Sequence, residues 1–332
     1  MTRTYTPAWW LGPHSATLWG RLARREPEPA VRIEQWDTPD GDFVEVARLA
    51  PRGDALTTPR LLLLHGLEGG LHSHYARGLF REAAHRGWGM DLLLFRTCGP
   101  TPNRLPRSYH SGETSDPLFV MERLAAESSA PLGVIGVSLG GNVLCKLLGE
   151  RGDALPEVMR GAVAVSVPFD LARASRWIGR GFGAVYEKAF LRSLIPKALA
   201  KIARHTELLP LTAVQQARTL WEFDDRFTAP LHGFHDAADY YACASSRAFV
   251  AAARRPLLLL SAVDDPFLPA DVLTDVAHSV KDNQQITVEF LRKGGHVGFV
   301  SGRSPWRPDY YGERRAVEFL SPLLVRGVAH MG

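Results

Sequence analysis

The stretch Leu132-Gly133-Val134-Ile135-Gly136-Val137-Ser138-Leu139-Gly140 decides the fold. Its apolar part ends at Val137, and a helix-like run follows from Asn142 to Leu148. This order predicts a strand, a sharp turn and a helix, with the Ser138 hydroxyl exposed above a sheet. The flanking glycines are needed because strand and helix come too close together there for side chains. Residues 136–140 therefore predict a nucleophile elbow, although Gly-x-Ser-x-Gly by itself also arises by chance.

The composition is that of an ordinary globular protein. The 332 residues suffice for one large core, or for a core with a lid. Hydrophobic residues make up 45% and charged residues 22%, which is typical of soluble domains. The net charge of +4 comes from scattered basic residues rather than from one stripe interleaved with aromatics. The composition therefore indicates no nucleic-acid partner, and it gives no oligomeric state.

The cysteines and the N-terminus predict a cytoplasmic protein. Cys98, Cys145 and Cys243 are odd in number and widely spaced, which fits neither a disulfide framework nor a zinc cluster. Free thiols persist in a reducing compartment. The first residues lack the apolar core of a signal peptide, and no run approaches the ~18 apolar residues of a membrane span. We therefore expect a soluble protein of the cytoplasm.

Strand-like and helix-like segments alternate along most of the chain. Two stretches of alternating hydrophobicity, 31–36 and 43–49, flank Asp40-Gly41 and predict an antiparallel hairpin. The alternation that follows predicts an α/β fold with a mostly parallel sheet flanked by helices. The strands are expected at 61–64, 91–95, 132–137, 161–167, 257–260 and 286–291, and the helices at 73–85, 116–128, 142–148 and 312–325.

The strand rhythm stops between residues 169 and 250, where aromatics and helix formers dominate. Because this block lies between two predicted strands, it predicts a helical lid inserted over the carboxyl edge of the sheet. Most of the lid aromatics should form the core of the lid, but an apolar lid above a serine would also make an acyl-chain pocket. The expected organisation is an N-terminal extension with a hairpin (1–50), a core in two parts (51–168 and 251–332) and the lid (169–250).

A candidate base and a candidate acid follow the elbow in the expected order. A serine hydroxyl needs a neighbouring base, and the base needs an acid to orient it. Behind an elbow serine these residues follow at the ends of two later strands, first the acid and then the histidine. The first of those strands is followed by Asp264 and Asp265, and the second by Gly294-Gly295-His296. We therefore expect Ser138, Asp265 and His296 to form a catalytic triad.

Asp264 and Asp265 compete for the role of the acid. Asp265 is preferred because Asp-x-x-x-Pro is the usual frame, with Pro269 in the first turn of the next helix. Asp264 would then bond nearby backbone amides as a turn residue. For His296 the alternative is an ordinary loop histidine. The tandem glycines before it argue against that, since they let the loop bring the ring over Ser138.

Two backbone N–H groups must stabilise the negative charge that develops on the substrate oxygen. One is expected from Leu139, directly after the nucleophile. The other is expected from Leu67, in the glycine-rich loop His65-Gly66-Leu67-Glu68-Gly69-Gly70. His65 could be mistaken for the base, but bracing of this loop by hydrogen bonding is the favoured interpretation.

Two other patterns are weaker. His232 and His235 lie three residues apart but lack a third ligand nearby, so no metal is expected. The run Gly179-Arg180-Gly181-Phe182-Gly183 fits a loose dinucleotide pattern but does not directly follow a strand.

The N-terminal region is rich in tryptophan and arginine. Such side chains could make a weak contact with a membrane surface. Packing of the tryptophans against the body of the protein is the favoured alternative. The residues concerned are Trp9, Trp10 and Trp19 beside Arg21, Arg24 and Arg25.

Seven motifs together carry a family resemblance: His65–Gly69, Asn103–Gly112, Gly136–Asn142, Glu222–Asp224, Tyr240-Tyr241, Asp264–Phe267 and Gly295–Phe299. With them the chain resembles the YheT-like branch of the α/β-hydrolase superfamily, which is related to the eukaryotic ABHD-type lipases. The resemblance covers nearly the whole chain, and the segment 103–112 is specific to this branch. One departure is the run 96–101, Arg-Thr-Cys-Gly-Pro-Thr, where members commonly carry Arg-Gly-Cys-Ser-Gly-Glu. That loop bears on substrate preference and not on the triad.

The resemblance implies a serine carboxylesterase or lipase-like enzyme that cleaves acyl esters through Ser138, Asp265 and His296. It adds no cofactor. An open apolar lid favours short- to medium-chain substrates. A thioesterase or an acyltransferase would use the same triad. A third hypothesis, from a different class, is a non-catalytic scaffold that binds a small ligand.

Overall fold

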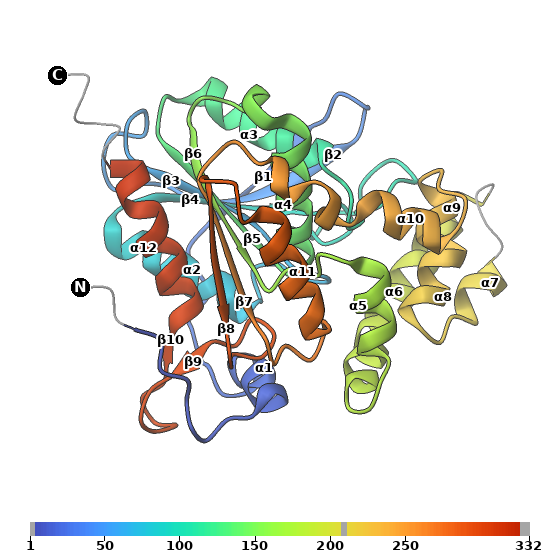
Figure 1. Cartoon of the computed structure of the whole chain (residues 1–332). Helices are drawn as coiled ribbons and strands as arrows, with labels where there is room; N and C mark the ends of the chain where they lie inside the picture. Colours follow the sequence, from blue (N-terminus) through green and yellow to red (C-terminus); the bar gives the residue numbers. More distant parts are fainter. Residues whose placement is uncertain (1–3, 207–210, 326–332) are drawn as a thin grey trace.

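The computed structural model describes residues 4–206 and 211–325, which form a central sheet with helices on both faces (Figure 1). The eight strands lie in the order β1-β2-β4-β3-β5-β6-β7-β8. Strand β2 is antiparallel to both its neighbours, and the pairings from β4 to β8 in that order are parallel. The strands are β1 Arg32–Asp37, β2 Phe43–Leu49, β3 Arg60–Leu64, β4 Gly89–Leu94, β5 Leu132–Val137, β6 Met159–Val165, β7 Leu257–Ala262 and β8 Ile286–Leu291.

The helices alternate with the strands, as the sequence predicts for an α/β fold. Helices α2 and α12 cover one face of the sheet, and α3, α4 and α11 cover the other. A two-stranded ribbon, β9 Val300–Ser301 with β10 Asp309–Tyr310, precedes the last helix. These helices are α1 Pro13–Leu22, α2 His74–Arg86, α3 Ser115–Glu127, α4 Leu139–Arg151, α11 Ala270–Val280 and α12 Tyr311–Val325, with short 3-10 turns at Gly152–Ala154, Ser246–Ala248 and Val250–Ala252.

The predicted N-terminal hairpin is part of the central sheet. β1 pairs with β2 from Arg32 opposite Arg48 to Asp37 opposite Phe43. β2 in turn pairs with β4, so the hairpin extends the parallel sheet at one edge. Residues 1–50 therefore hold two strands of the main sheet, together with α1.

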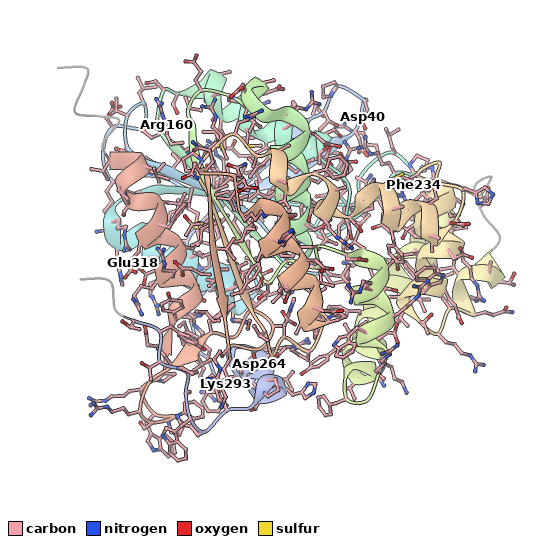
Figure 2. All side chains as sticks on the ribbon, viewed as in Figure 1. Asp40, Arg160, Phe234, Asp264, Lys293 and Glu318 are labelled. Atoms are coloured by element: carbon pink, nitrogen blue, oxygen red, sulfur yellow. The ribbon has the colours of Figure 1, made fainter. Side chains whose placement is uncertain are left out.

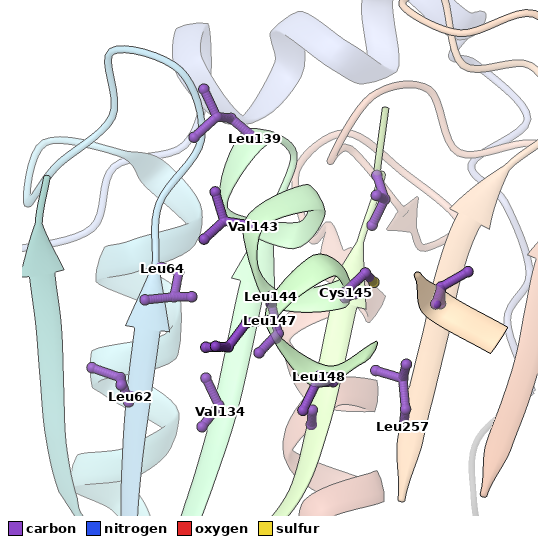
Figure 3. Close-up of a cluster of buried hydrophobic side chains, with 14 of the residues drawn as sticks. Leu62, Leu64, Val134, Leu139, Val143, Leu144, Cys145, Leu147, Leu148 and Leu257 are labelled. Atoms are coloured by element: carbon purple, nitrogen blue, oxygen red, sulfur yellow. The ribbon is translucent and has the colours of Figure 1, made fainter. Parts of the chain in front are cut away.

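The strands of the sheet interior carry leucine on both faces. Side chains alternate between the two sides of a strand, so Leu61 and Leu63 pack towards α2 and α12, while Leu62 and Leu64 pack towards α4. All four leucines are fully buried. Figure 3 shows Leu62 and Leu64 facing Val143 and the other apolar side chains of α4. Each such side chain contributes about 1.5–3 kcal/mol through burial, which fixes the elbow helix on the sheet.

The carboxyl ends of the parallel strands share one edge of the molecule. Figure 2 shows Arg160, near the start of β6, at one edge, and Asp264, just after β7, at the opposite edge beside α1. In α/β sheets, ligands bind in the crevice outside the carboxyl ends of the strands. The catalytic candidates all follow strand ends on this side.

Helices alone connect β6 to β7 in the described part of that segment, and they form a separate lobe (Figure 1). Positions 207–210 of the predicted lid lie outside the described residues. The lobe has an apolar cluster of its own, with members on α6, α7 and α8. Its helices are α5 Leu171–Ile178, α6 Gly183–Arg204, α7 Leu211–Gln215, α8 Leu220–Phe223, α9 Ala229–Leu231 and α10 Ala237–Ala244, with a π-helical turn at Asp224–Thr228.

Lys201 of α6 ties the lobe to the core. Its ammonium group donates to Asn103 Oδ1 at 2.7 Å, to the Leu105 carbonyl at 2.9 Å and to the Arg107 carbonyl at 3.1 Å. Burial lowers the pKa of Lys201 to about 8. Asn103 also donates to Asp42 at 2.6 Å. Part of the branch-specific segment 103–112 thus binds α6, the long helix of the lid.

None of the helices within residues 4–206 and 211–325 combines the length and the apolar composition that crossing a bilayer requires.

Candidate active site

Ser138 lies at the turn between β5 and α4 with φ 54° and ψ −118°. This left-handed region is costly for a residue with a side chain. The conformation is held because the Ser138 N–H donates to the Val165 carbonyl at 2.8 Å. A Cβ on Gly136 would lie 2.5 Å from the Gly140 carbonyl oxygen, and a Cβ on Gly140 would lie 2.2 Å from that of Leu64. Both positions therefore require glycine, as the elbow predicts.

The structure brings Ser138, His296 and Asp265 together. His296 Nε2 lies 2.9 Å from Ser138 Oγ, and His296 Nδ1 lies 2.8 Å from Asp265 Oδ2. The network assigns the proton to Nδ1, which donates to the carboxylate, so that Nε2 accepts from the serine hydroxyl. His296 and Asp265 are both buried. Three side chains 158 and 31 residues apart in sequence thus form one hydrogen-bonded line.

Asp264 has a different partner from its neighbour. Its Oδ1 accepts the N–H groups of Gly294 at 2.8 Å and Gly295 at 2.9 Å, in the loop that carries the histidine. It therefore bonds backbone amides, but amides 30 residues away rather than in its own turn. Pro269 is the residue just before α11 and not a member of its first turn, since the helix begins at Ala270.

Two hydroxyls that sequence reasoning missed hold the histidine loop. Thr17 Oγ1, on α1, accepts the His296 N–H at 2.9 Å, and Ser166 Oγ accepts the Val297 N–H at 2.9 Å. Val297 and Ser166 both have positive φ, 58° and 51°. Ser166 follows directly after β6, so its place at a strand end was a usable signal. Thr17 lies 279 residues from His296 and offered none.

The loop after β3 presents a free amide beside Ser138. A Cβ on Gly66 would lie 3.2 Å from Ser138 Cβ, so the loop passes directly over the nucleophile. The Gly66 N–H donates to Tyr75 OH at 2.8 Å, and the Glu68 N–H donates to Tyr109 OH at 3.0 Å. Between them, the N–H of Leu67 has no acceptor within residues 4–206 and 211–325, and neither does that of Leu139. These are the two predicted oxyanion donors.

His65 is buried beneath this loop. Its Nδ1 lies 2.7 Å from the Gly66 carbonyl, and its Nε2 accepts the Phe95 N–H at 3.2 Å. Burial lowers its pKa to about 4, so the ring is neutral at pH 7. With both ring nitrogens occupied by backbone, His65 braces the loop in the way we expected.

Glu68 links the oxyanion loop to the lid. It has φ 56°, and its carboxylate accepts from Tyr109 OH at 2.9 Å and from Lys197 Nζ at 2.8 Å. Ser193 donates to it as well. Lys197 and Ser193 lie on α6, whereas Tyr109 belongs to the branch-specific segment. This cluster was not predicted, although Tyr109 stands within a motif that the resemblance had singled out.

A cavity of about 150 Å³ opens between the lid and the catalytic residues. Both Ser138 and His296 line it, as does Leu67. Its walls are predominantly apolar, with side chains of Leu171, Ile178, Phe190, Leu194, Phe223 and Phe227.

The other sequence candidates lie apart from one another. His232 is partly buried, with Nδ1 2.8 Å from the Thr228 carbonyl and Nε2 2.9 Å from the Ser108 carbonyl. His235 is exposed and contacts Asp236. The loose dinucleotide run connects α5 to α6, with a helix before it rather than a strand.

The divergent loop 96–101 reaches the cavity through Thr97. Its first residue, Arg96, is buried and contacts Asp116 at 2.7 and 2.8 Å. Cys98 is partly buried, and burial raises the pKa of its thiol to about 12. Thr97, one of the residues that depart from the family pattern, therefore lines the cavity.

Comparison with known proteins agrees with this fold. A model of the alpha/beta hydrolase fold family matches residues 59–302. The YheT protein of Escherichia coli (strain K12) is 38% identical over 314 residues, which cover 94% of this chain and 91% of YheT. Phospholipase ABHD3 of Mus musculus is 28% identical over 338 residues, which cover 98% of this chain and 80% of that protein.

Solved structures share the fold. Esterase Pf2001 of Pyrococcus furiosus superimposes with a TM-score of 0.55 at 16% identity and covers 98% of both chains. The esterase of Pyrobaculum calidifontis gives a TM-score of 0.58 at 17% identity, covering 95% of this chain and 91% of the other. At such low sequence identities, these two structures are evidence for the fold alone. The family model and the relative at 38% identity carry the assignment: the chain belongs to the YheT-like branch of the α/β-hydrolase superfamily and is a hydrolase.

Proposed function

We propose that this protein is a serine carboxylesterase that cleaves acyl esters through an acyl-enzyme on Ser138. The observation that carries the proposal is the line of hydrogen bonds from Ser138 Oγ through the imidazole of His296 to Asp265, with distances of 2.9 and 2.8 Å. That arrangement has the parts of an activated serine nucleophile: a hydroxyl, a base and an acid that orients the base.

The reaction has two halves. Ser138 Oγ attacks the ester carbonyl carbon while His296 Nε2 takes the hydroxyl proton, and the carbonyl oxygen becomes an oxyanion. The unpaired N–H groups of Leu67 and Leu139 stabilise that charge. The C–O bond to the alcohol then breaks, and the imidazolium returns its proton to the leaving alcohol. In the second half, water attacks the acyl-enzyme by the same steps and releases the acid.

Asp265 keeps the proton on Nδ1 throughout. Its Oδ2 accepts that proton's hydrogen bond, which fixes the ring orientation and stabilises the imidazolium. Its Oδ1 accepts the Phe267 N–H at 2.8 Å, so the carboxylate itself is held from the backbone.

The apolar cavity supports a short- to medium-chain acyl group. A dry cavity of about 150 Å³ lined by apolar side chains accepts a ligand of benzene size in other proteins, and this one has the same volume class. The name phospholipase of the 28%-identical relative adds support for a lipid-derived ester. Three free cysteines, Cys98, Cys145 and Cys243, support a reducing, cytoplasmic setting.

The test is a panel of p-nitrophenyl esters of graded chain length with the purified protein, together with labelling by a fluorophosphonate probe. Ser138→Ala is expected to lose labelling completely and turnover by at least ~1000-fold. Ser129→Ala, at an exposed serine, is the control and should keep both. Labelling of Ser138→Ala at the wild-type level would refute the nucleophile. Matched acyl-CoA thioesters belong in the same panel, because a thioesterase would hydrolyse them faster than the esters.

A further inference from the structure

Large apolar side chains stand exposed along one edge of the molecule. Trp306 is 88% exposed, Trp9 is 80% exposed and Leu22, at the end of α1, is 76% exposed. The indole N–H of Trp9 donates to the Arg303 carbonyl at 3.3 Å, so the two tryptophans belong to adjoining loops. Scattered exposed apolar residues are normal. Apolar side chains of this size on neighbouring segments form a patch of the kind that marks an interaction site.

The tip of the lid continues this patch. Phe182, just before α6, and Val185, in the first turn of α6, are each at least half exposed. The Phe182 ring contacts His14 of α1, with centroids 4.7 Å apart. Figure 1 shows α1, the β9–β10 ribbon and the α5–α6 tip along the same lower edge. We call this surface the entrance face: it comprises residues 9–25, the loop 302–307 and the lid tip 177–185.

The remaining N-terminal tryptophans are partly buried. Trp10 and Trp19 pack against each other, with ring centroids 4.6 Å apart, and Arg24 is buried in ion pairs with Glu313 and Glu26. Trp9 differs, since its ring is held only at one edge and points to solvent.

A run of aromatic contacts leads from the entrance face to the catalytic histidine. Phe182 contacts Tyr186 at 5.7 Å, Tyr186 contacts Phe267 at 4.9 Å, and Phe267 contacts His296 at 4.1 Å, all between ring centroids. Phe267 and His296 also line the acyl cavity. The exposed lid tip is therefore three ring contacts away from the base, beside the route that a substrate would take from this edge.

The charge of the entrance face has one sign. Its segments 9–25, 177–185 and 302–307 contain six arginines and no Asp or Glu. Among the exposed arginines of this face, Arg21, Arg25, Arg303 and Arg307 form no ion pair within the described residues. Exposed tryptophan mixed with unpaired arginine is the composition of proteins that bind the surface of an anionic bilayer.

We propose that the entrance face docks on an anionic lipid bilayer, with Trp9, Trp306 and Phe182 inserted at the headgroup level and the arginines on lipid phosphates. Docking would set the mouth of the acyl cavity against the bilayer, so that ester substrates enter directly from the lipid. This second consequence rests on the proposed function, whereas the docking itself does not.

Binding is tested with the full-length Ser138→Ala protein, which separates docking from catalysis. Its sedimentation is measured with vesicles of phosphatidylcholine alone and with vesicles containing 30 mol% phosphatidylglycerol. We expect at least tenfold stronger partitioning onto the anionic vesicles, weakened by high salt. Adding Trp9→Ala and Trp306→Ala should reduce partitioning at least tenfold, and Arg303→Glu with Arg307→Glu should abolish the preference for anionic lipid. Leu56→Ala is the matched control, because Leu56 is 56% exposed and lies in the loop before β3, at the opposite edge of the sheet.

The entry of substrate directly from the lipid is tested with enzyme that retains Ser138. The double tryptophan variant should hydrolyse a soluble butyrate ester at the wild-type rate but lose at least tenfold of its rate on an ester embedded in anionic vesicles. Equal binding to neutral and anionic vesicles, or none to either, overturns the proposal. So does a wild-type dimer in sedimentation velocity that the tryptophan substitutions convert to monomer, since the face would then bind a second copy. If vesicles bind but no ester is cleaved, docking stands and the proposed function fails.

Discussion

The ring of Phe267 lies almost flat on the imidazole of His296, with centroids 4.1 Å apart and 18° between the planes. The same residue donates its backbone N–H to Asp265 Oδ1 at 2.8 Å. One position thus holds the base by its side chain and the acid by its main chain. Because the imidazole becomes cationic in the transition state, an aromatic face against it also stabilises the charge that forms.

Replacing Phe267 by leucine should lower kcat by roughly 3- to 30-fold, the size of a partly desolvated cation–π contact. The substitution keeps the backbone N–H to Asp265 and most of the apolar volume. Steady-state kinetics on a short-chain ester measure the effect, and Phe267→Tyr, which retains the ring, is the control. An unchanged kcat in Phe267→Leu would show that the stacking has no part in turnover.

The two aspartates should respond differently to substitution. In Asp265→Asn the remaining oxygen accepts the Phe267 N–H, so an amide N–H faces His296 Nδ1 and favours the wrong tautomer; kcat should fall by about 10⁴-fold while the fold stays intact. Asp264→Asn keeps an oxygen that accepts the N–H groups of Gly294 and Gly295, and should lower kcat less than tenfold. Activity and thermal unfolding measured in parallel test this pair. Equal losses of kcat would contradict the assignment of the acid.

Tyr109 is expected to position the oxyanion donor. Its hydroxyl accepts the Glu68 N–H and donates to the Glu68 carboxylate, which holds a residue of φ 56° next to Leu67. Such a backbone conformation costs about 1–3 kcal/mol and persists only when its surroundings hold it. Tyr109→Phe should therefore lower kcat about tenfold with little change in KM.

A matched variant separates positioning from stability. Tyr240→Phe removes a buried hydroxyl that also accepts a backbone N–H, from Ser111 at 2.8 Å, but one outside the oxyanion loop. Both variants should unfold at similarly lowered temperatures, and only Tyr109→Phe should lose kcat. If the two lose kcat equally, Tyr109 is merely structural.

The parts of the site that sequence predicts are those governed by short-range rules. The elbow around Ser138 needs only the steric demands of one turn, and the positions of Asp265 and His296 follow from strand ends that share one edge of a sheet. Leu139 is predicted because it directly follows the nucleophile, and Leu67 because it lies in the loop after a strand of the same sheet. Local pattern also found each of the eight main strands to within a few residues.

The parts that sequence does not predict depend on contacts between distant segments. Nothing in the sequence near Thr17 indicates that α1 packs on the histidine loop. The backbone of α1 lies so close to Gly295 and Gly298 that a Cβ at either glycine would clash with it. The bond between Glu68 and the lid is set by how α6 lies over the core, which no local pattern encodes. The bonds from Asp264 to the amides of a loop 30 residues further along likewise have no local signal.

Asp224 gives the structure a pH dependence of its own. It lies partly buried in the π-helical turn of the lid, lines the acyl cavity and accepts from Thr228 and Tyr241 at 2.6 Å each. It forms no ion pair within the part of the chain that the structure describes. Burial raises its pKa from the ordinary 3.8 to about 6.

The sign of the effect on stability follows from this shift. Below pH ~4 the carboxyl is protonated in the folded and unfolded states, so its neutral form is accommodated without penalty. Between pH 4 and 6 the unfolded chain ionises and the folded protein does not, so the free energy of unfolding falls as the pH rises, by up to about 3 kcal/mol. Above pH ~6 the loss is complete, because both states are then ionised.

Asp224→Asn should remove this dependence, since the amide stays neutral and still offers an oxygen acceptor. Urea unfolding of wild type and variant at intervals from pH 4 to pH 7 measures it: the variant should gain stability relative to wild type as the pH rises. Asp153→Asn, at an exposed aspartate, is the control and should follow wild type across the range. A constant difference between Asp224→Asn and wild type from pH 4 to pH 7 would mean that Asp224 is already ionised at pH 4. The lid would then have to stabilise the buried charge through its two hydroxyl donors alone.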